Sequence, residues 1–252
     1  TAGIDQLKQI SMTLREGEIV GIAGVSGNGQ SELLDVLSGI MAPTGGHFTV
    51  GTNQITAERP SDPAELRDFG VAHVPEDRHK CGIVLPFSAA ESMILGYSGG
   101  DEEDGGWWLS PSKLEESCAG RMREFDIRPP IPKLQSANFS GGNQQKIVLA
   151  REISTQPKLL LVGQPTRGVD IGAIEFIHKQ LIALRNEGCA ILLVSVELDE
   201  IMSLSDRILV MNNGQIVGEL AREDADERAL GLMMAGIGAE EKDAGSAKGA
   251  AS

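Results

Sequence analysis

Residues Phe139 to Ala150 read Phe-Ser-Gly-Gly-Asn-Gln-Gln-Lys-Ile-Val-Leu-Ala and set the pattern against which the rest of the chain is interpreted. A serine and two glycines open an apolar helical stretch whose first turn carries polar side chains. The free N–H groups and the positive dipole end of such a helix suit an anion such as phosphate. An ordinary helix start with Ser140 as its cap fits the same residues. The function of this stretch therefore depends on what accompanies it elsewhere in the chain.

A glycine-rich loop, Gly24-Val25-Ser26-Gly27-Asn28-Gly29-Gln30-Ser31, lies upstream between an apolar strand-like run and a helical one. Its spacing is that of a phosphate loop, G-x-x-x-x-G-K-[ST], except that Gln30 stands where lysine is expected. The glycines allow backbone N–H groups to surround a phosphate, and the Ser31 hydroxyl is a candidate ligand for Mg²⁺. A plain tight turn is the alternative for this loop taken alone.

A third segment, the apolar run 158–162 followed by Gln-Pro-Thr-Arg-Gly-Val-Asp at 164–170, completes a recognisable order. Phosphate loop, helix start and strand in this order resemble the nucleotide-binding domain of ABC transporters over residues 10–234. The helix start is similar to the signature motif of that family. By this resemblance the signature consists of Ser140, Gly141, Gly142, Asn143 and Gln144. The resemblance implies an α/β phosphate-loop (ABC) fold with a mixed sheet core, an antiparallel β subdomain and a helical subdomain.

The resemblance also sets the expected domain organisation. Residues 1–238 are predicted to form a single nucleotide-binding domain, with the helical subdomain inserted at about 79–137. Residues 239–252 are mostly Gly, Ala, Glu, Lys and Ser, which predicts a disordered tail. Trp107 and Trp108 follow an acidic glycine loop and are interpreted as core anchors of the helical subdomain, with exposed contacts as the alternative.

Local patterns predict the individual elements. Strands are expected at 9–14, 18–23, 69–74, 158–162 and 190–195, with hairpins at 45–54 and 206–217. Helices are expected at 32–38, 88–97, 112–125, 173–186 and 226–234.

Several positions depart from the family pattern. The strand 158–162 should end in an aspartate that holds Mg²⁺ and a glutamate that polarises water, but Gly163 and Gln164 stand there. Val196 replaces the histidine expected after the strand 190–195, and Gln30 replaces the lysine of the loop. Asp170 matches the loop aspartate that communicates between paired domains. The resemblance assigns nucleotide binding to Gly24, Ser26, Gly27, Asn28, Gly29, Gln30, Ser31, Glu32 and Glu76.

Glu76 stands where the family has a glutamine, within the run Pro-Glu-Asp-Arg at 75–78. This run resembles the second nucleotide-binding half of the tandem ATPases that drive importers of simple sugars and nucleosides. A solvated loop with a local ion pair is the alternative interpretation of these charges.

These departures have a chemical consequence. Phosphoryl transfer to water needs a cationic clamp on the terminal phosphates, a placed Mg²⁺ and an oriented water. A single Glu-to-Gln change would suit a laboratory trap for nucleotide, whereas four replacements at Gln30, Gly163, Gln164 and Val196 indicate a naturally degenerate half. No intact catalytic residue is therefore predicted. The loop backbone and the helix dipole allow weak binding of ATP with Mg²⁺. The negative charge of Glu76 beside the phosphates favours Mg²⁺-dependent binding or no binding, so the sequence leaves ATP binding open. The signature is predicted to complete the site of a partner domain.

Composition limits the partners. The formal net charge of -14 argues against a surface for nucleic acid. Three scattered cysteines show no ligand spacing for zinc, and no apolar run approaches the length of a membrane span. The resemblance implies a partner nucleotide-binding domain in the same polypeptide, membrane permease subunits and, indirectly, a substrate-binding protein. It places the chain in the cytoplasm on the inner face of the cell membrane. Because the chain begins at Thr1 without methionine, it is expected to be a piece of a longer protein.

Other functions fit parts of the pattern. A self-sufficient ABC ATPase that forms homodimers would need the chain alone to turn over ATP. A non-transport ABC protein acting on nucleic acid would bind RNA or DNA in a salt-sensitive way. A purely structural module would bind no nucleotide.

Overall fold

A six-stranded sheet forms the centre of the computed structural model, which describes residues 6–97 and 111–237. The strand order is β4-β5-β6-β1-β7-β8. Every neighbouring pair is parallel except β7 and β8, which are antiparallel. The strands are β1 (Ile19–Ala23), β4 (Val71–Val74), β5 (Leu159–Gly163), β6 (Ala190–Val194), β7 (Arg207–Asn212) and β8 (Gln215–Ala221). The predicted α/β fold with a mixed sheet is confirmed.

Alternate residues of the central strands pack into two separate cores, one on each face of the sheet. In β6, Ile191 and Leu193 face one core while Leu192 faces the other. β5 follows the same rule, with Leu160 in the first core and Leu161 in the second. A strand that is covered on both faces has no solvent-facing side where polar residues would be expected. This explains the continuous apolar runs in the sequence.

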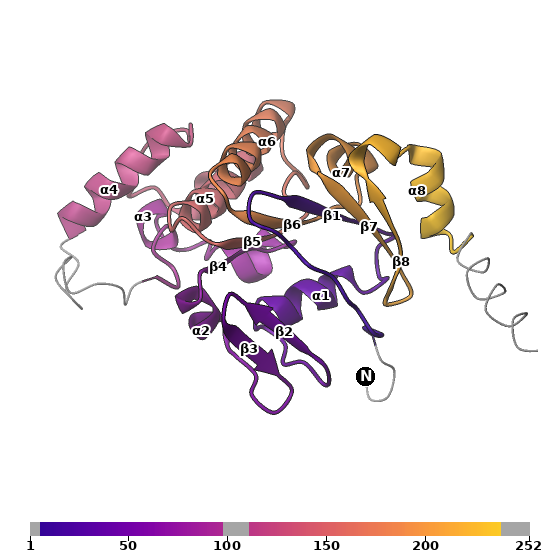
Figure 1. Cartoon of the computed structure of the whole chain (residues 1–252). Helices are drawn as coiled ribbons and strands as arrows, with labels where there is room; N and C mark the ends of the chain where they lie inside the picture. Colours follow the sequence, from indigo (N-terminus) through magenta and orange to yellow (C-terminus); the bar gives the residue numbers. More distant parts are fainter. Residues whose placement is uncertain (1–5, 98–110, 238–252) are drawn as a thin grey trace, which may run out of the picture.

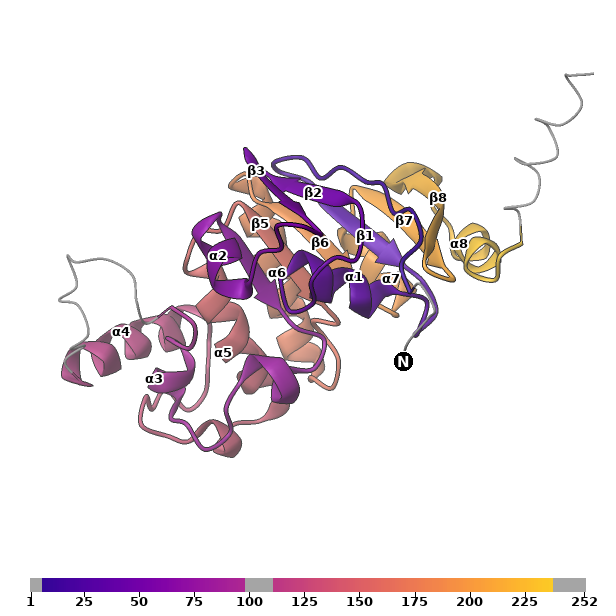
Figure 2. The same cartoon turned by 90° about the horizontal axis from the view of Figure 1, so that it is seen from below.

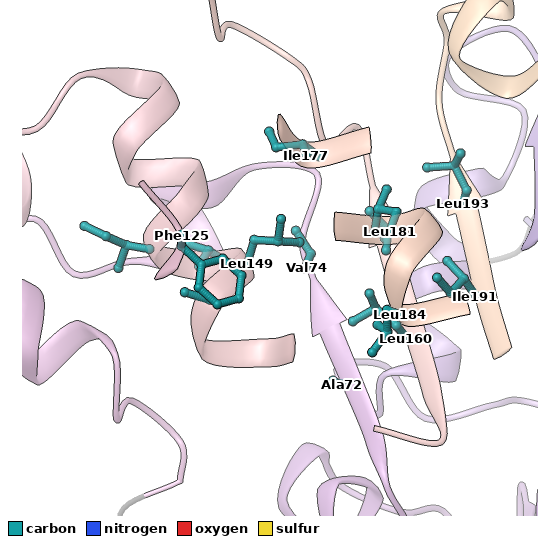
Figure 3. Packing of buried hydrophobic residues seen from close by; sticks show 14 of the residues in the cluster. Ala72, Val74, Phe125, Leu149, Leu160, Ile177, Leu181, Leu184, Ile191 and Leu193 are labelled. Carbon is teal, nitrogen blue, oxygen red and sulfur yellow. The ribbon is translucent and has the colours of Figure 1, made fainter. Parts of the chain in front are cut away.

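The first core lies under α5 (Gly141–Ile153) and α6 (Ile171–Asn186), which cover one face of the sheet in Figure 1. Figure 3 shows Ile177 and Leu181 facing Leu160, Ile191 and Leu193 across this layer. The second core lies under α1 (Gln30–Leu37), α2 (Pro63–Asp68) and the antiparallel pair β2 (His47–Val50) and β3 (Asn53–Thr56). Figure 2 shows this second face, where the predicted hairpin after Gly45 is confirmed.

A helical part lies between β4 and α5 in the chain. Its elements are η1 (Arg78–Gly82), α3 (Ala89–Ser92), α4 (Pro111–Glu124) and η3 (Ser136–Asn138). α3 and α4 lie beside α5 at one end of the molecule (Figures 1 and 2), and Met122 and Phe125 join the first core. Trp107 and Trp108 lie outside the described residues, as does the predicted tail 239–252.

The helix predicted at Ser88–Tyr97 is wrong in length, because α3 ends at Ser92. Ser88 opens it with a capping box that includes Glu91, so the start follows from sequence. The chain then turns, and Gly96 takes a φ of 88° with the Arg67 guanidinium packed against it. A side chain at Gly96 would collide with Arg67, and this packing favours a turn over further helix.

The strand predicted at Gln9–Leu14 is also wrong, because these residues pair with no neighbouring strand. Ile10, Met12 and Leu14 pack against the second core, which explains their alternation. The Arg207 guanidinium donates a hydrogen bond to the Thr13 carbonyl at 2.5 Å. Burial of alternate side chains thus occurs here without a strand ladder.

The last third of the chain follows prediction closely. β7 and β8 form the expected hairpin around Asn213, and α8 (Glu227–Met234) is the expected closing helix. α7 (Leu198–Leu204) and η4 (Arg222–Asp224) are additional short elements. Among the helices of the described ranges, none is both long and apolar enough to cross a bilayer.

Phe125 tests how the helical part is held. Its ring is 1% exposed and meets the Phe176 ring edge-on with centroids 6.1 Å apart. Phe125→Ala should lower the free energy of unfolding by about 3–5 kcal/mol, because it leaves a cavity. Urea denaturation measures the loss, with Phe87→Ala, at a ring 39% exposed, as the matched control. Equal losses in the two variants would contradict this packing.

His73 predicts a pH dependence of stability. Its Nε2 is buried without a hydrogen-bond partner, and burial, with smaller effects of Arg67 and Arg151, lowers its pKa to about 4. The unfolded chain takes up this proton below pH 6.5 while the folded chain does not. Stability should therefore fall as the pH drops from 6.5 to 4, by up to about 3 kcal/mol from this group. In the His73→Gln variant, the free energy of unfolding should fall less between pH 6.5 and pH 4 than in the wild type. The His47→Gln variant, changed on the exposed β2, should show the same fall as the wild type.

Candidate functional site

The carboxyl ends of β1, β4, β5 and β6 meet at one edge of the sheet, since these strands are parallel neighbours. Ligands of open α/β sheets bind outside this edge. A cleft of about 810 Å³ lies there. Its lining brings together five predicted residues from four loops, namely Ser26, Ser31, Glu76, Gln164 and Val196.

The phosphate loop follows β1, whose residues are all buried. Gly27 and Gly29 take φ values of 89° and 103°, which a side chain disfavours, and α1 begins at once after Gly29. The amide N–H of Asn213 in the β7–β8 turn donates to the Asn28 side chain, and Gly214 N–H donates to the Asn28 carbonyl at 2.9 Å. The β7–β8 turn therefore fixes the loop by hydrogen bonds to Asn28, and the N-terminus of α1 lies at the cleft.

Gln30 does not extend into the cleft as a lysine would. Its side chain is 5% exposed, and its Nε2 donates to the Val25 carbonyl at 3.2 Å. A Cβ on Gly24 would overlap this amide, so the glycine makes room for it. Gln30 thus fills the inside of the loop with a neutral group and supplies no cation.

Ser31 and Glu76 form a direct pair across the cleft. Ser31 Oγ donates to Glu76 Oε2 at 2.5 Å, joining the first turn of α1 to the segment after β4. Glu32, the next predicted residue, is half-buried in the same turn. A hydroxyl and a carboxylate side by side are the hard oxygen donors that Mg²⁺ prefers.

Gln164 and Val196, two of the positions predicted to depart from the family pattern, are linked to each other. Gln164 Oε1 accepts the Val196 N–H at 3.3 Å, and Gln164 N–H donates to the Val194 carbonyl at 2.8 Å. Gln164 holds a φ of 47°, an unfavourable conformation for a side-chain-bearing residue. This residue therefore ties the end of β5 to the end of β6. Val196 itself is 45% exposed, and its hydrocarbon side chain can donate no hydrogen bond to a phosphate.

The charges of the cleft disfavour a bare triphosphate. Carboxylates of Glu76, Glu197, Asp199 and Glu200 line it, against the guanidinium of Arg167. Glu200 is 4% exposed and pairs with His178 Nε2 at 2.9 Å, joining α7 to α6. In the described parts of the chain, no three His, Cys, Asp or Glu side chains gather as a metal-binding cluster. A cation held here would need oxygen ligands from a bound phosphate as well.

The signature lies apart from this cleft. Ser140 caps α5, and its Oγ accepts hydrogen bonds from both the backbone and the side-chain N–H of Asn143. Asn143 Oδ1 accepts the Arg128 N–H at 2.9 Å, which fixes the amide of Asn143. Gly142, Asn143 and Asp170 line a second, shallower depression of about 310 Å³. One chain therefore presents its phosphate loop and its signature in two separate places.

The two glycines of the signature are required by close packing. A Cβ on Gly141 would come within 2.8 Å of Arg78 Nη2 and 2.9 Å of the Gly168 carbonyl. A Cβ on Gly142 would come within 2.9 Å of Asp170 Oδ2. Asp170 in turn caps α6 by accepting the Ala173 N–H at 3.0 Å. The predicted inter-domain aspartate thus lies directly against the signature.

Gln144 points into the protein. It is 6% exposed, its Oε1 meets His79 Nε2 at 2.8 Å, and its Nε2 donates to the Ser136 carbonyl at 3.0 Å. Lys146 behaves similarly, with Nζ 3.3 Å from Asp126 Oδ2. A hydrogen bond from Arg128, and secondarily Lys146, lowers the pKa of Asp126. The polar first turn of α5 therefore anchors the helical part as much as it faces outward.

Arg78 is a functional candidate for which the sequence indicated no role beyond its place in the run 75–78. Its Nη1 donates to the Arg167 carbonyl at 2.9 Å, and its Nη2 lies against Gly141. Its Nε is buried without a partner, and burial lowers its pKa while Asp77 opposes this effect. The pair His178–Glu200 was missed as well. No local spacing signals either feature, because the partners lie on elements far apart in the chain.

Comparison with known proteins agrees with this geometry. The family model described as "ABC transporter" matches residues 7–167. The guanosine import ATP-binding protein NupO of Bacillus subtilis is 41% identical over 249 residues, which are 99% of this chain and 48% of that protein. The glucose import ATP-binding protein TsgD13 of Haloferax volcanii is 42% identical over 238 residues, 94% of this chain and 43% of that protein. The chain thus spans about half the length of these curated relatives.

The fold is shared with solved structures too. A dimeric ATP-binding cassette in a post-hydrolysis state, bound to ADP and Pi, superposes with a TM-score of 0.71 at 23% identity, covering 86% of this chain and 90% of that one. The chain belongs to the ABC transporter family and has the fold of its ATP-binding cassettes.

Proposed function

We infer that this chain is a catalytically degenerate ATP-binding domain of an importer for nucleosides or simple sugars. It supplies its signature to the ATP site of a partner nucleotide-binding domain in the same polypeptide. Closure of the pair is coupled to membrane permease subunits, which receive their cargo from a substrate-binding protein. The domain works at the inner face of the cell membrane.

One observation carries this proposal: Ser140 and Asn143 of the predicted signature lie at the surface, while Gln164 and Val196 line the cleft at positions where the family pattern has a glutamate and a histidine. Ser140 and Asn143 are hydrogen-bonded into a fixed arrangement beside Asp170. In the cleft, Gln30 is turned inward and Gln164 holds Val196. Loss of a general base or of a charge-stabilising group commonly costs about two to four orders of magnitude in rate. Such a chain serves a partner's site better than its own.

The domain is proposed to bind ATP without hydrolysing it. The positive φ values of Gly27 and Gly29 and the N-terminus of α1 provide the backbone arrangement that receives phosphate. Ser31 and Glu76 offer oxygen donors toward Mg²⁺. When bound, Mg²⁺ would neutralise phosphate charge that no lysine neutralises here. Ser26, Asn28 and the loop glycines are proposed to surround the phosphates.

The proposed substrate class is inferred from the names of similar proteins. The similar proteins named for guanosine and for glucose import support a nucleoside or simple-sugar importer. Their lengths, about twice the matched region, support a partner domain in the same polypeptide. The dimeric cassette with ADP and Pi supports pairing of two such domains around nucleotide.

Ser140→Arg tests the proposal in the two-domain polypeptide. A bulky cation in the signature should lower its phosphate release by about a hundredfold, because it blocks the partner's site. Ser140→Ala separates this effect from loss of the helix cap, which should cost about 1 kcal/mol of stability. Ser11→Arg, at an exposed position away from the signature, is the matched control and should keep full activity.

The isolated chain completes this test. It should bind ATP in calorimetric titration and release no phosphate above the buffer background. Phosphate release that rises with chain concentration and disappears in Ser140→Arg would instead establish a self-sufficient homodimeric ATPase. Unchanged activity of the two-domain protein carrying Ser140→Arg would refute the signature role.

Arg78 should couple the signature to the loop that carries Asp170. Arg78→Ala removes the hydrogen bond to the Arg167 carbonyl and should speed amide exchange in residues 140–142 and 167–170 about fivefold. Hydrogen exchange of the purified chain measures this, with the β1 and β5 amides as internal reference. Arg167→Ala is the matched control. It also removes one positive charge, from an exposed side chain, but it keeps the backbone carbonyl that accepts the Arg78 hydrogen bond. Equal changes in both variants would contradict the coupling.

A further inference from the structure

Residues 6–8, which we call the N-terminal segment, lie against the turn between β7 and β8. The Lys8 N–H donates to the Gly214 carbonyl at 2.7 Å, and Lys8 Nζ donates to Asn213 Oδ1 at 3.3 Å. A Cβ on Gly214 would overlap the Gln6 carbonyl oxygen. Figures 1 and 2 show this indigo segment beside the β7–β8 hairpin. The backbones of the segment and the turn are therefore packed together with no side chain between them.

The same turn holds the phosphate loop. The N–H groups of Asn213 and Gly214 both donate to Asn28, one to its side-chain oxygen at 3.2 Å and the other to its carbonyl at 2.9 Å. A Cβ on Gly29 would lie 3.1 Å from the Gln6 carbonyl oxygen and 3.2 Å from Gly214 Cα. The N-terminal segment, the turn and the loop thus contact one another through their backbones.

We propose that the N-terminal segment is a positioning element for nucleotide, because it fixes the turn that holds the phosphate loop in the conformation that receives phosphate. This inference rests on the nucleotide binding proposed above. Among the described residues that line the cleft, none belongs to this segment. Its effect on ATP should therefore reach the loop through Gly214 and Asn28.

The neutral loop makes this positioning important. Because Gln30 is turned inward, the loop offers phosphate its backbone N–H groups and hydroxyls but no side-chain cation. Gly27 and Gly29 hold positive φ values, and a free glycine has no preference for them, so other contacts must hold them there. A loop that is only partly in the binding conformation binds more weakly by that fraction. The affinity for ATP should therefore depend on the contacts that fix the loop.

Two substitutions loosen the N-terminal segment in different ways. Lys8→Pro removes the N–H that bonds to the Gly214 carbonyl, whereas Lys8→Ala keeps it. Gly214→Ala places a Cβ against the Gln6 carbonyl at a φ of 77°. Gly46→Ala is the matched control for this strain. Gly46 has a φ of 74°, but apart from its chain neighbours no atom of the described residues lies within 4 Å of where its Cβ would be.

Calorimetric titration of the purified chain with ATP and Mg²⁺ measures the effect. Lys8→Pro and Gly214→Ala should each raise the dissociation constant about fivefold, the effect of losing one hydrogen bond. Lys8→Ala and Gly46→Ala should stay within about twofold of the wild type. Tripolyphosphate, which has the phosphate chain without the nucleoside, should lose affinity by the same factor as ATP. A loss for ATP but not for tripolyphosphate would place the effect at the nucleoside and overturn the inference.

Hydrogen exchange separates positioning of the loop from a general loss of stability. Amides 27–31 should exchange about fivefold faster in Lys8→Pro and Gly214→Ala, while the amides of β5 and β6 keep their wild-type rates. Equal acceleration in both sets of amides, or wild-type dissociation constants in both variants, would overturn the inference and leave the proposed nucleotide binding standing. If the wild-type chain binds no ATP, the proposed nucleotide binding fails and this inference fails with it, while the signature role keeps its own test.

Discussion

The close approach of three segments at the start of α5 is the constraint on which the arrangement of the site depends. Arg78, the Gly168 carbonyl and the Asp170 carboxylate all come within 3 Å of where a Cβ on Gly141 or Gly142 would lie. The segment after β4, the loop after β5 and the signature are therefore packed together at two points without side chains. Such close packing leaves little room for one of these segments to shift alone. The two glycines thus contact one backbone carbonyl, that of Gly168, and two side chains, those of Arg78 and Asp170.

The sheet places these segments, and the sequence predicted the sheet well. Apolar runs at 18–23, 158–162 and 190–195 became the parallel strands β1, β5 and β6, because burial on both faces requires such runs. Glycine spacing likewise located the loop before α1 and the start of α5. The same pattern reasoning failed at Gln9–Leu14, where alternate residues are buried without pairing, and at α3, whose end depends on Arg67 packing against Gly96. Both errors arise from tertiary contacts.

Within the site, the sequence predicted which residues depart from the family pattern but not which contacts those residues make. Gln30, Gln164 and Val196 were predicted as losses, and the role of these positions remains a prediction. The structure adds that Gln30 binds the Val25 carbonyl and that Gln164 binds the Val196 N–H. The contacts of Arg78 with the Arg167 carbonyl and of Glu200 with His178 join residues distant in the chain. No spacing rule reaches that far, so only the folded chain brings these partners together.

The filled space beside Gly163 limits how this chain can change over evolutionary time. A Cβ built at residue 163 would overlap Glu76 Cγ and would lie 2.9 Å from Leu34 Cδ1 and 3.0 Å from the Glu76 backbone nitrogen. A larger residue at 163 would therefore require both α1 and the segment after β4 to shift. A substitution at this position is expected to be tolerated only together with changes at residues 34 or 76.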